Sequence, residues 1–581
     1  MTDYDSEKHP VEKISETSSD VLPDVDGTYA REELIDPSKE ETLHRSLSAR
    51  QISMIALGGA VGTGLIIGSG TALVRGGPLG LLLGYTFVGM VCYMVMVALG
   101  EMSAYLPHKK GFPGYSTRFV DPAFGFALGW NYLLKYLIVT PNNINAAGVV
   151  IQYWNDSIHI AVWMVFFVNL LGVRVFGELE FWFSSIKVIT LIGLILMGII
   201  IDLGGNPGHD RIGFRYWKHP NGPMGHYLLD QVHSEHLSIF LGFWATLTNA
   251  LFAYIGTELI GVTVGEAQAP RKNIPIAIRR TFFRIVVFYI GGVFVIGLIV
   301  PSTDNVGLPL VTLYKYVHLS FRFLRPYLLP TNLRLEQQPL RSSLVSFIEL
   351  PGNPYFTLIE CMRSATTLVG IKVLNHVING CILLFVLSAA NSDLYIASRT
   401  LYGLAIEGKA PRLFARVNRM GVPYPALILS VMFCGLVFLN VSSSSSKARL
   451  GVPMLTEGFS RFMKALKAQG FSRDNLPYKA PFQPFGSWFA LISTGIIMIF
   501  KGFDTFIPFT TDTFVTSYIA IPAFVLFWAS YKIWYRTKVI PVERVDLITG
   551  KREIDEEEER FNHEEAMKGP RTKWEQVWDS L

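Results

Sequence analysis

The chain has 581 residues, of which 50% are hydrophobic and only 17% are charged. Soluble proteins carry about 25% charged residues, so this composition excludes an ordinary soluble protein. The net charge of +5 is small and spread along the chain, so it does not indicate nucleic-acid binding. The four cysteines, Cys92, Cys361, Cys381 and Cys434, form no pattern typical of a disulfide framework.

The two ends of the chain are hydrophilic. Residues 1–50 hold thirteen Asp and Glu against six Lys and Arg, and they contain no apolar run typical of a cleavable signal. Residues 536–581 include the acidic run Glu556–Glu559. The sequence therefore predicts an N-terminal tail over 1–50 and an acidic C-terminal tail over 536–581, both aqueous and either disordered or loosely docked.

Eleven apolar segments between these tails can be interpreted as membrane-spanning helices, since about 20 residues cross the hydrocarbon core. The segments are 52–74, 77–100, 123–150, 158–173, 181–203, 237–260, 285–303, 372–396, 424–442, 486–501 and 513–533. The sequence thus predicts an all-α polytopic membrane protein whose transmembrane domain covers 51–535.

The positive charges of the short loops predict the orientation. Lys and Arg gather before the first segment and after the second, sixth and eighth, which places the N-terminus in the cytoplasm. The pattern fails after the ninth segment, where the count puts seven Lys and Arg outside. Residues 443–460 are too polar to cross, so we infer a twelve-helix plan that lacks one helix there. Residues 307–370 form an irregular insertion.

Two predicted spans are interrupted by glycine at corresponding positions. The first contains Gly58–Gly64 (GGAVGTG), and the sixth, five spans later, contains Ala253–Glu258 (AYIGTE). Such pairs indicate a transporter binding site. A broken helix leaves free N–H groups on one end and free C=O groups on the other, which suit a carboxylate and an ammonium. The pair predicts a zwitterion site, although Gly62 and Gly64 could also serve only close helix packing.

Three ionisable residues inside predicted spans are the first functional candidates, because charge in a membrane is expensive and usually functional. Glu258, beside the break in the sixth span, is either a gating or proton-coupled carboxylate or a residue bonded to nearby backbone. Lys187, in the middle third of the fifth span, can replace a bound Na⁺ and tie the broken helix to the scaffold. Lys135, in the third span, either attracts an anionic substrate side chain or faces an aqueous vestibule.

Other functional classes have no support in the sequence. No GxxxxGK[ST] motif is present, which argues against an ATP-driven pump. No nucleophile–base pair or metal-ligand cluster indicates an enzyme, and no cofactor or metal is predicted.

Several motifs together resemble the fungal amino acid permeases of the amino acid–polyamine–organocation superfamily. They are GGAVGTGLIIGSG, FGELEFWFSSIKV, FAYIGTEL, GEAQAPRKNIPIAIRR and SAANSDLYIASRTLYGLA. FGELEFWFSSIKV, HDRIGFRYW and VDLITGKREID are most similar to the dicarboxylic branch. The resemblance implies the inverted-repeat fold of leucine transporters and proton-coupled uptake of amino acids at the plasma membrane, with acidic substrates for that branch. The partners it implies are an amino acid, protons and the lipid bilayer.

The resemblance also implies residue roles. The substrate carboxylate would bind Gly62, Thr63 and Gly64, and its ammonium would bind Phe252, Ala253 and Tyr254. Asn391 and Ser392 would face the same site, and Lys187 would occupy the position of the second sodium site. Lys135 would meet the second carboxylate of an acidic substrate. The helix missing near 443–460 is the tenth of the family plan, which leaves two alternatives: an amino acid sensor on the same fold, or a transport-defective permease.

Overall fold

The computed structural model describes residues 51–52, 54–55, 63–107, 111–151, 173–205, 209–218, 222–264, 267, 269–302, 372–419, 421–435, 451–507, 509 and 511–567. The predicted N-terminal tail, the predicted insertion at 307–370 and all but the last residue of the predicted span 158–173 lie outside these ranges. The described part contains helices and connecting segments, with an isolated β-bridge between Phe506 and Phe509.

The helices overlap the predicted spans, although α15 (Lys372–Ile406) continues past the predicted end at 396 and the predicted span 513–533 is divided between α19 (Thr511–Tyr518) and α20 (Ala520–Tyr535). In chain order they are α2 (Thr63–Tyr105), α3 (Gly111–Phe119), α4 (Pro122–Ile151), α6 (Val173–Asp202), α8 (Glu235–Ala253), α9 (Leu259–Thr263), α10 (Pro270–Arg284), the π-helix η4 (Ile285–Gly291), α11 (Gly292–Ile299), α15 (Lys372–Ile406), α16 (Tyr424–Cys434), α17 (Gly451–Ala468), α18 (Phe485–Phe500), α19 (Thr511–Tyr518), α20 (Ala520–Tyr535) and α21 (Lys551–Met567). Short turns of helix connect some of them: η2 (Arg215–Trp217), α7 (Leu229–Val232), η5 (Arg412–Ala415), η8 (Arg473–Asn475), η9 (Phe503–Thr505) and η10 (Val542–Arg544).

Six helical stretches of the described part are long and apolar enough to cross a membrane. They are Gly68–Tyr105, Val175–Asp202, Glu235–Ala253, Pro270–Ile299, Asn379–Ile406 and Phe485–Thr505. α6 shows the expected lipid-facing surface, because Trp182, Ile189 and Leu196 on it are more than half exposed. The prediction of an all-α polytopic membrane protein is confirmed.

The first two predicted spans are joined in α2. The helix continues from one into the other, but the chain kinks at Gly77, whose φ of 70° and ψ of 176° are not helical. A side chain at Gly77 would lie 2.5 Å from the backbone nitrogen of Gly225, so only glycine fits there. Pro78 follows and cannot supply a helical N–H, which completes the corner between the two spans.

The predicted start of the seventh span was wrong. The sequence placed Arg271, Arg279 and Arg284 in a loop before residue 285, but they lie on α10, which begins at Pro270 and continues through η4 into α11. Proline is well placed at the first position of a helix, because its missing N–H would have no intrahelical partner there. The stretch from Pro270 to Ile299 is therefore one helical rod.

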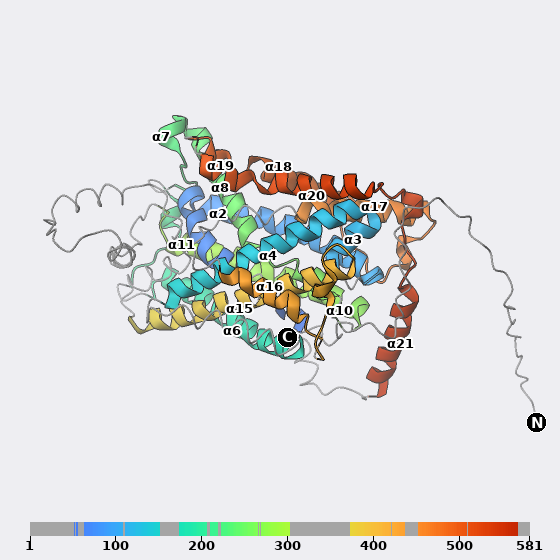
Figure 1. The fold of residues 1–581 in the computed structure, drawn as a ribbon. Helices are drawn as coiled ribbons and strands as arrows, with labels where there is room; N and C mark the ends of the chain where they lie inside the picture. The colour runs from blue at the N-terminus through green and yellow to red at the C-terminus, as the bar shows by residue number, and fades with distance from the viewer. Residues whose placement is uncertain are drawn as a thin grey trace, which may run out of the picture. The chain divides into compact units, whose positions relative to one another are not determined.

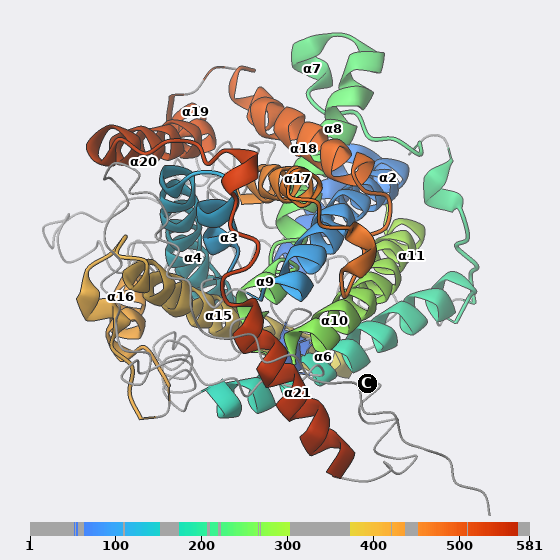
Figure 2. The same cartoon turned by 90° about the vertical axis from the view of Figure 1, so that its right-hand side faces the viewer.

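α2 is the central helix of the described core. It packs along α8 over the most extensive helix contact of the described part and also touches α10, α11, α17 and α18, while α4 packs between α15 and α20 (Figures 1 and 2). α17 covers part of the segment after the ninth span. It is amphipathic, buries Phe459, Phe462 and Ala465 against its neighbours, and is not among the six apolar stretches that could cross a membrane.

The C-terminal segment is docked as far as Met567. The sequence predicted a tail that is either disordered or loosely docked, and the disordered alternative does not hold for this part. The Ile540 amide donates to the Val120 carbonyl at 3.0 Å, and Arg118 donates to the Asp546 and Thr549 carbonyls at 2.7 and 2.8 Å. Val545 is almost fully buried. Apolar burial and backbone hydrogen bonds together outweigh the hydrophilic composition of the segment.

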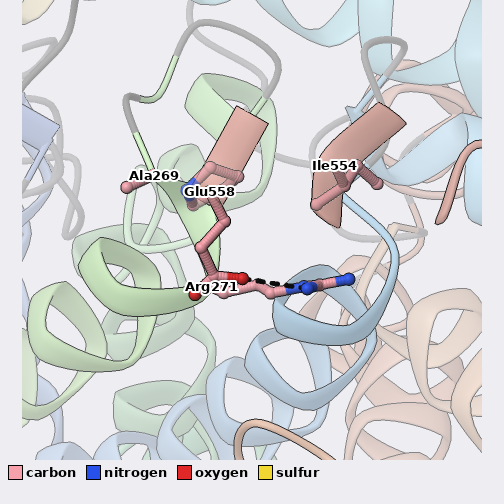
Figure 3. A pocket seen from close by; sticks show the side chains of 5 residues that line it. Ala269, Arg271, Ile554 and Glu558 are labelled. Carbon is pink, nitrogen blue, oxygen red and sulfur yellow. Dashed lines mark hydrogen bonds and ion pairs between the residues drawn. The ribbon is translucent and has the colours of Figure 1, made fainter. Parts of the chain in front are cut away.

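The acidic helix α21 contacts the start of α10. Arg271 pairs with Asp555 at 2.5 Å and with Glu558 at 2.9 Å. Figure 3 shows the contact with Glu558 at a small pocket that Ala269 and Ile554 also line. In Figure 2, α21 crosses in front of α10. The acidic run predicted from the sequence therefore has a specific cationic partner.

We predict that Arg271→Ala loosens α21. Ion pairs with partly exposed partners contribute up to about 1 kcal/mol, so amide hydrogen exchange over 551–567 should become about fivefold faster. The matched control is Arg552→Ala, whose pair with Glu556 on the same helix is exposed and should leave exchange unchanged. Equal exchange in the Arg271 variant and the unmodified chain would contradict a role for this contact.

The stability of the docked C-terminal segment depends on pH through the carboxyl group of Asp546. Burial alone would raise the pKa of this carboxyl, but the Thr549 and Ile548 amides and Arg118 outweigh burial and lower the pKa below its ordinary value. Because the pKa of Asp546 is lower in the folded state, its carboxylate contributes fully to stability at neutral pH. This contribution is lost as the pH falls through the lowered pKa.

Candidate functional site

The sixth predicted span is broken where the sequence indicated. α8 ends at Ala253 and α9 begins at Leu259, and the residues between them form turns. Gly256 has a φ of 101°, a conformation that ends the helix and that residues with side chains rarely adopt. The turns satisfy part of the exposed backbone, because the Ile255 amide donates to the Phe252 carbonyl at 3.3 Å and the Thr257 hydroxyl donates to the Tyr254 carbonyl at 3.0 Å.

The start of α2 lies directly against this break. A Cβ atom on Gly64 would be 2.5 Å from the Phe252 carbonyl oxygen and 2.6 Å from the Ala253 Cα, so the two backbones touch. Thr63 is the first residue of α2, and Gly62 lies outside the described residues. The first N–H groups of a helix have no intrahelical acceptor. The structure therefore brings together the end of one interrupted helix and the beginning of the other.

Two tyrosines, Tyr254 and Tyr289, hold the backbone of the break against the core. The Tyr254 side chain points into the core, donates to the Tyr85 carbonyl at 2.9 Å and stacks on Tyr289 with ring centroids 4.5 Å apart. The Tyr289 hydroxyl in turn donates to the Ala253 carbonyl at 3.3 Å. A carbonyl oxygen has two lone pairs. The Tyr254 carbonyl already accepts from both the amide and the hydroxyl of Thr257, whereas the Ala253 carbonyl accepts from Tyr289 and can take one further donor.

Glu258 and Lys135, which the sequence singled out as separate residues, form a buried ion pair. The Lys135 ammonium lies 2.5 Å from Glu258 Oε1, and their side chains are 5% and 15% exposed. Tyr136 donates to the same oxygen at 3.0 Å, while the Gly256 amide donates to Oε2 at 2.9 Å. This arrangement ties α4 to the break. Because the Lys135 side chain is buried, the structure does not support the alternative in which it faces an aqueous vestibule.

Lys187 is fully buried on α6. Its ammonium lies 6.0 Å from the centre of the Phe385 ring and interacts electrostatically with Glu180 and Asp393. On the same helix, Ser184 donates to the Met54 carbonyl at 2.9 Å, which ties α6 to the first predicted span.

Asn391 and Ser392 lie where α15 meets α6. Asn391 donates to Glu180 Oε2 at 3.4 Å, and Ser388 donates to Oε1 at 2.5 Å. Ser392 is fully buried beside Glu180. These predicted residues are therefore brought to Glu180 and, through Glu180, into the neighbourhood of Lys187.

Two buried carboxyl groups, Glu180 and Asp393, were not predicted from the sequence. Asp393 on α15 accepts a hydrogen bond of 2.6 Å from Asn143 on α4 and is 4% exposed. Glu180 fell one residue before the predicted fifth span, and Asp393 directly follows the two residues chosen from the eighth. Both would have been found if every ionisable residue inside a predicted span, or within one helical turn of its ends, had been considered as a functional candidate.

Apolar spans and a broken helix that packs against the start of another are typical of the class of secondary transporters. The sequence profile of the family described as "Amino acid permease" matches residues 51–542, and the chain belongs to this family. It is 42% identical to the dicarboxylic amino acid permease of Saccharomyces cerevisiae over 91% of this chain and 84% of that one. It is 36% identical to the basic amino-acid permease of the same yeast over 96% and 92%. A solved manganese transporter from Eremococcus coleocola aligns with a TM-score of 0.47 and 12% identity over 84% of this chain and 93% of that one.

The family confirms that this is an amino acid transporter of the multi-pass membrane type rather than an enzyme, and the leucine-transporter-like fold predicted from the resemblance fits the observed helices.

Proposed function

We propose that this chain imports amino acids across the plasma membrane by proton symport, with its N-terminus in the cytoplasm. The observation that carries the proposal is the contact between the start of α2 at Gly64 and the end of α8 at Ala253. The first N–H groups of α2 and the last carbonyl groups of α8 would meet there, and a zwitterionic amino acid needs donors and acceptors of this kind. Residues 51–535 would be the permease domain, with the insertion at 307–370 and without a spanning helix near 443–460.

The binding roles follow from this contact. Gly62, Thr63 and Gly64 would donate to the substrate carboxylate, and the carbonyl groups of Phe252, Ala253 and Tyr254 would accept from its ammonium. The spare acceptor capacity of the Ala253 carbonyl supports the second part. Asn391 and Ser392 would line the site from α15.

Coupling to protons would involve Lys187 and Glu258. Both are ionisable groups at membrane depth, where an unpaired charge costs several kcal/mol, so each is expected to change partner or protonation during transport. Support comes from their surroundings: Lys187 interacts with Glu180, and Glu258 holds the break through Gly256 and α4 through Lys135.

We propose further that acidic amino acids are preferred. A second substrate carboxylate needs a cationic partner in the site, and Lys135 could supply one when Glu258 is protonated and releases it. The name of the dicarboxylic relative agrees with this preference, while the name of the basic relative shows that similar chains serve other substrates.

The test is uptake of labelled glutamate by cells that express the full chain. We expect accumulation against the gradient, collapse of that accumulation with a proton uncoupler, and competition by aspartate but not by leucine or lysine. Accumulation that survives the uncoupler would contradict proton symport. Equal competition by leucine and aspartate would contradict the acidic preference. A chain that reaches the surface and accumulates no amino acid would instead be a sensor or a transport-defective permease.

A further inference from the structure

The charges buried around the break do not balance. Three carboxyl groups and two ammonium groups lie there, from α4, α6, the break and α15, and they are Glu180, Glu258, Asp393, Lys135 and Lys187. If all five were ionised, the cluster would carry a net charge of −1. A single excess charge in a low-dielectric region costs several kcal/mol, which binding one proton removes.

The three carboxyl groups differ in their contacts with the two ammonium groups. Glu258 accepts from Lys135 at 2.5 Å, with Tyr136 and the Gly256 amide as further donors. Glu180 lies seven residues, or about two turns, before Lys187 on α6 and interacts with its charge. Glu180 also accepts from Ser388 and Asn391. These contacts favour the anionic form of Glu258 and Glu180 and oppose the effect of burial.

Asp393 is the third carboxyl group. Among the described residues its hydrogen-bond donor is the neutral amide of Asn143, at 2.6 Å, and it makes no ion pair with any of them. The charges of Lys135 and Lys187 act on it favourably, and that of Glu258 acts unfavourably. Tyr132 and Tyr136 of α4 and Cys434 of α16 complete the titratable groups around it.

We infer that Asp393 is the group that binds the transported proton. The inference deepens the proposed function and rests on it. A proton from the outer side binds a carboxylate oxygen of Asp393, the cluster becomes neutral, and the proton leaves that oxygen to water on the inner side. Protonation of Asp393 does not itself require the Lys135–Glu258 ion pair to break, so the release of Lys135 by Glu258 proposed above is a separate step.

Asp393→Asn tests the inference, because the amide resembles the protonated carboxyl in shape and cannot release a proton. We expect concentrative glutamate uptake to fall at least tenfold and the remaining uptake to be the same at outside pH 5 and pH 7. The matched control is Asp121→Asn, which alters a buried carboxyl outside the cluster, paired with Lys532. Uptake by this control should keep the pH profile of the unmodified chain, whatever its surface abundance.

Asp393→Glu keeps a carboxyl group and displaces it by one methylene group, which covers the case in which the amide variant does not reach the membrane. A shift in the pH at which uptake is half-maximal supports the inference, and an unchanged pH profile in this variant or in Asp393→Asn overturns it. Uptake by the unmodified chain that is insensitive to the uncoupler would overturn proton symport itself. Coupled uptake in the unmodified chain together with normal coupling in Asp393→Asn would overturn the role of Asp393 alone.

Discussion

Gly64→Ala is expected to reduce amino acid uptake by a factor of about 100 or more. The added Cβ would lie 2.5 Å from the Phe252 carbonyl oxygen and 2.6 Å from the Ala253 Cα, and both are backbone atoms that cannot rotate away. Relieving the clash requires the start of α2 and the end of α8 to separate, at a cost of about 1–3 kcal/mol or more. The separation would misplace the groups proposed to bind the two ends of the substrate, and small displacements in such a site are costly.

The measurement is initial uptake normalised to surface abundance. Gly68→Ala is the matched control, since it lies one turn further along α2 and its Cβ would come no closer than 3.8 Å to the Asn249 carbonyl oxygen. This control should retain most of the uptake. Uptake by Gly64→Ala above half that of the unmodified chain would contradict a binding site built on close contact between the two helices.

Lys135→Met is expected to destabilise the folded chain by about 3–5 kcal/mol, because it leaves the Glu258 carboxylate buried without its cation. This is a large part of the roughly 5–15 kcal/mol by which a typical protein is stable. We therefore expect low surface abundance and a markedly lower unfolding temperature in detergent. Glu258→Gln should behave similarly, since it leaves the Lys135 ammonium without a counter-charge.

The double variant Lys135→Met with Glu258→Gln distinguishes a pair from two independent contributions. Removing both charges is often nearly neutral for stability, so the double variant should be more stable than either single variant. Its uptake should remain low, because the proposed coupling and side-chain groups are gone. The control is Arg215→Met, whose pair with Asp210 is exposed and should contribute less than about 1 kcal/mol. Additive losses in the double variant would show that the two residues act separately.

The helices themselves were largely predictable from the sequence. The third predicted span, 123–150, differs by one residue at each end from α4, and the tenth, 486–501, differs equally little from α18. The reason is physical: a spanning helix must satisfy its backbone internally and present about 20 apolar residues to lipid, so its signal is local. The break at Gly256 was also local, since glycine at that position permits a conformation that ends the helix.

The pairing of charges depended on the tertiary structure. Lys135 and Glu258 are 123 residues apart, and Glu180 meets Ser388 across 208 residues. Which side chains meet depends on how each helix is rotated about its axis and where it crosses its neighbours, and the hydropathy of a span carries little of that information.

The same holds for the C-terminal segment, whose acidic composition predicted solvent exposure but whose docking depends on Arg118 and Arg271 of distant helices. The sequence by itself therefore determined the spans and the position of the break, because both signals are local. Helix packing alone decided which buried charges neutralise one another, and it left Asp393 without an ion pair among the described residues.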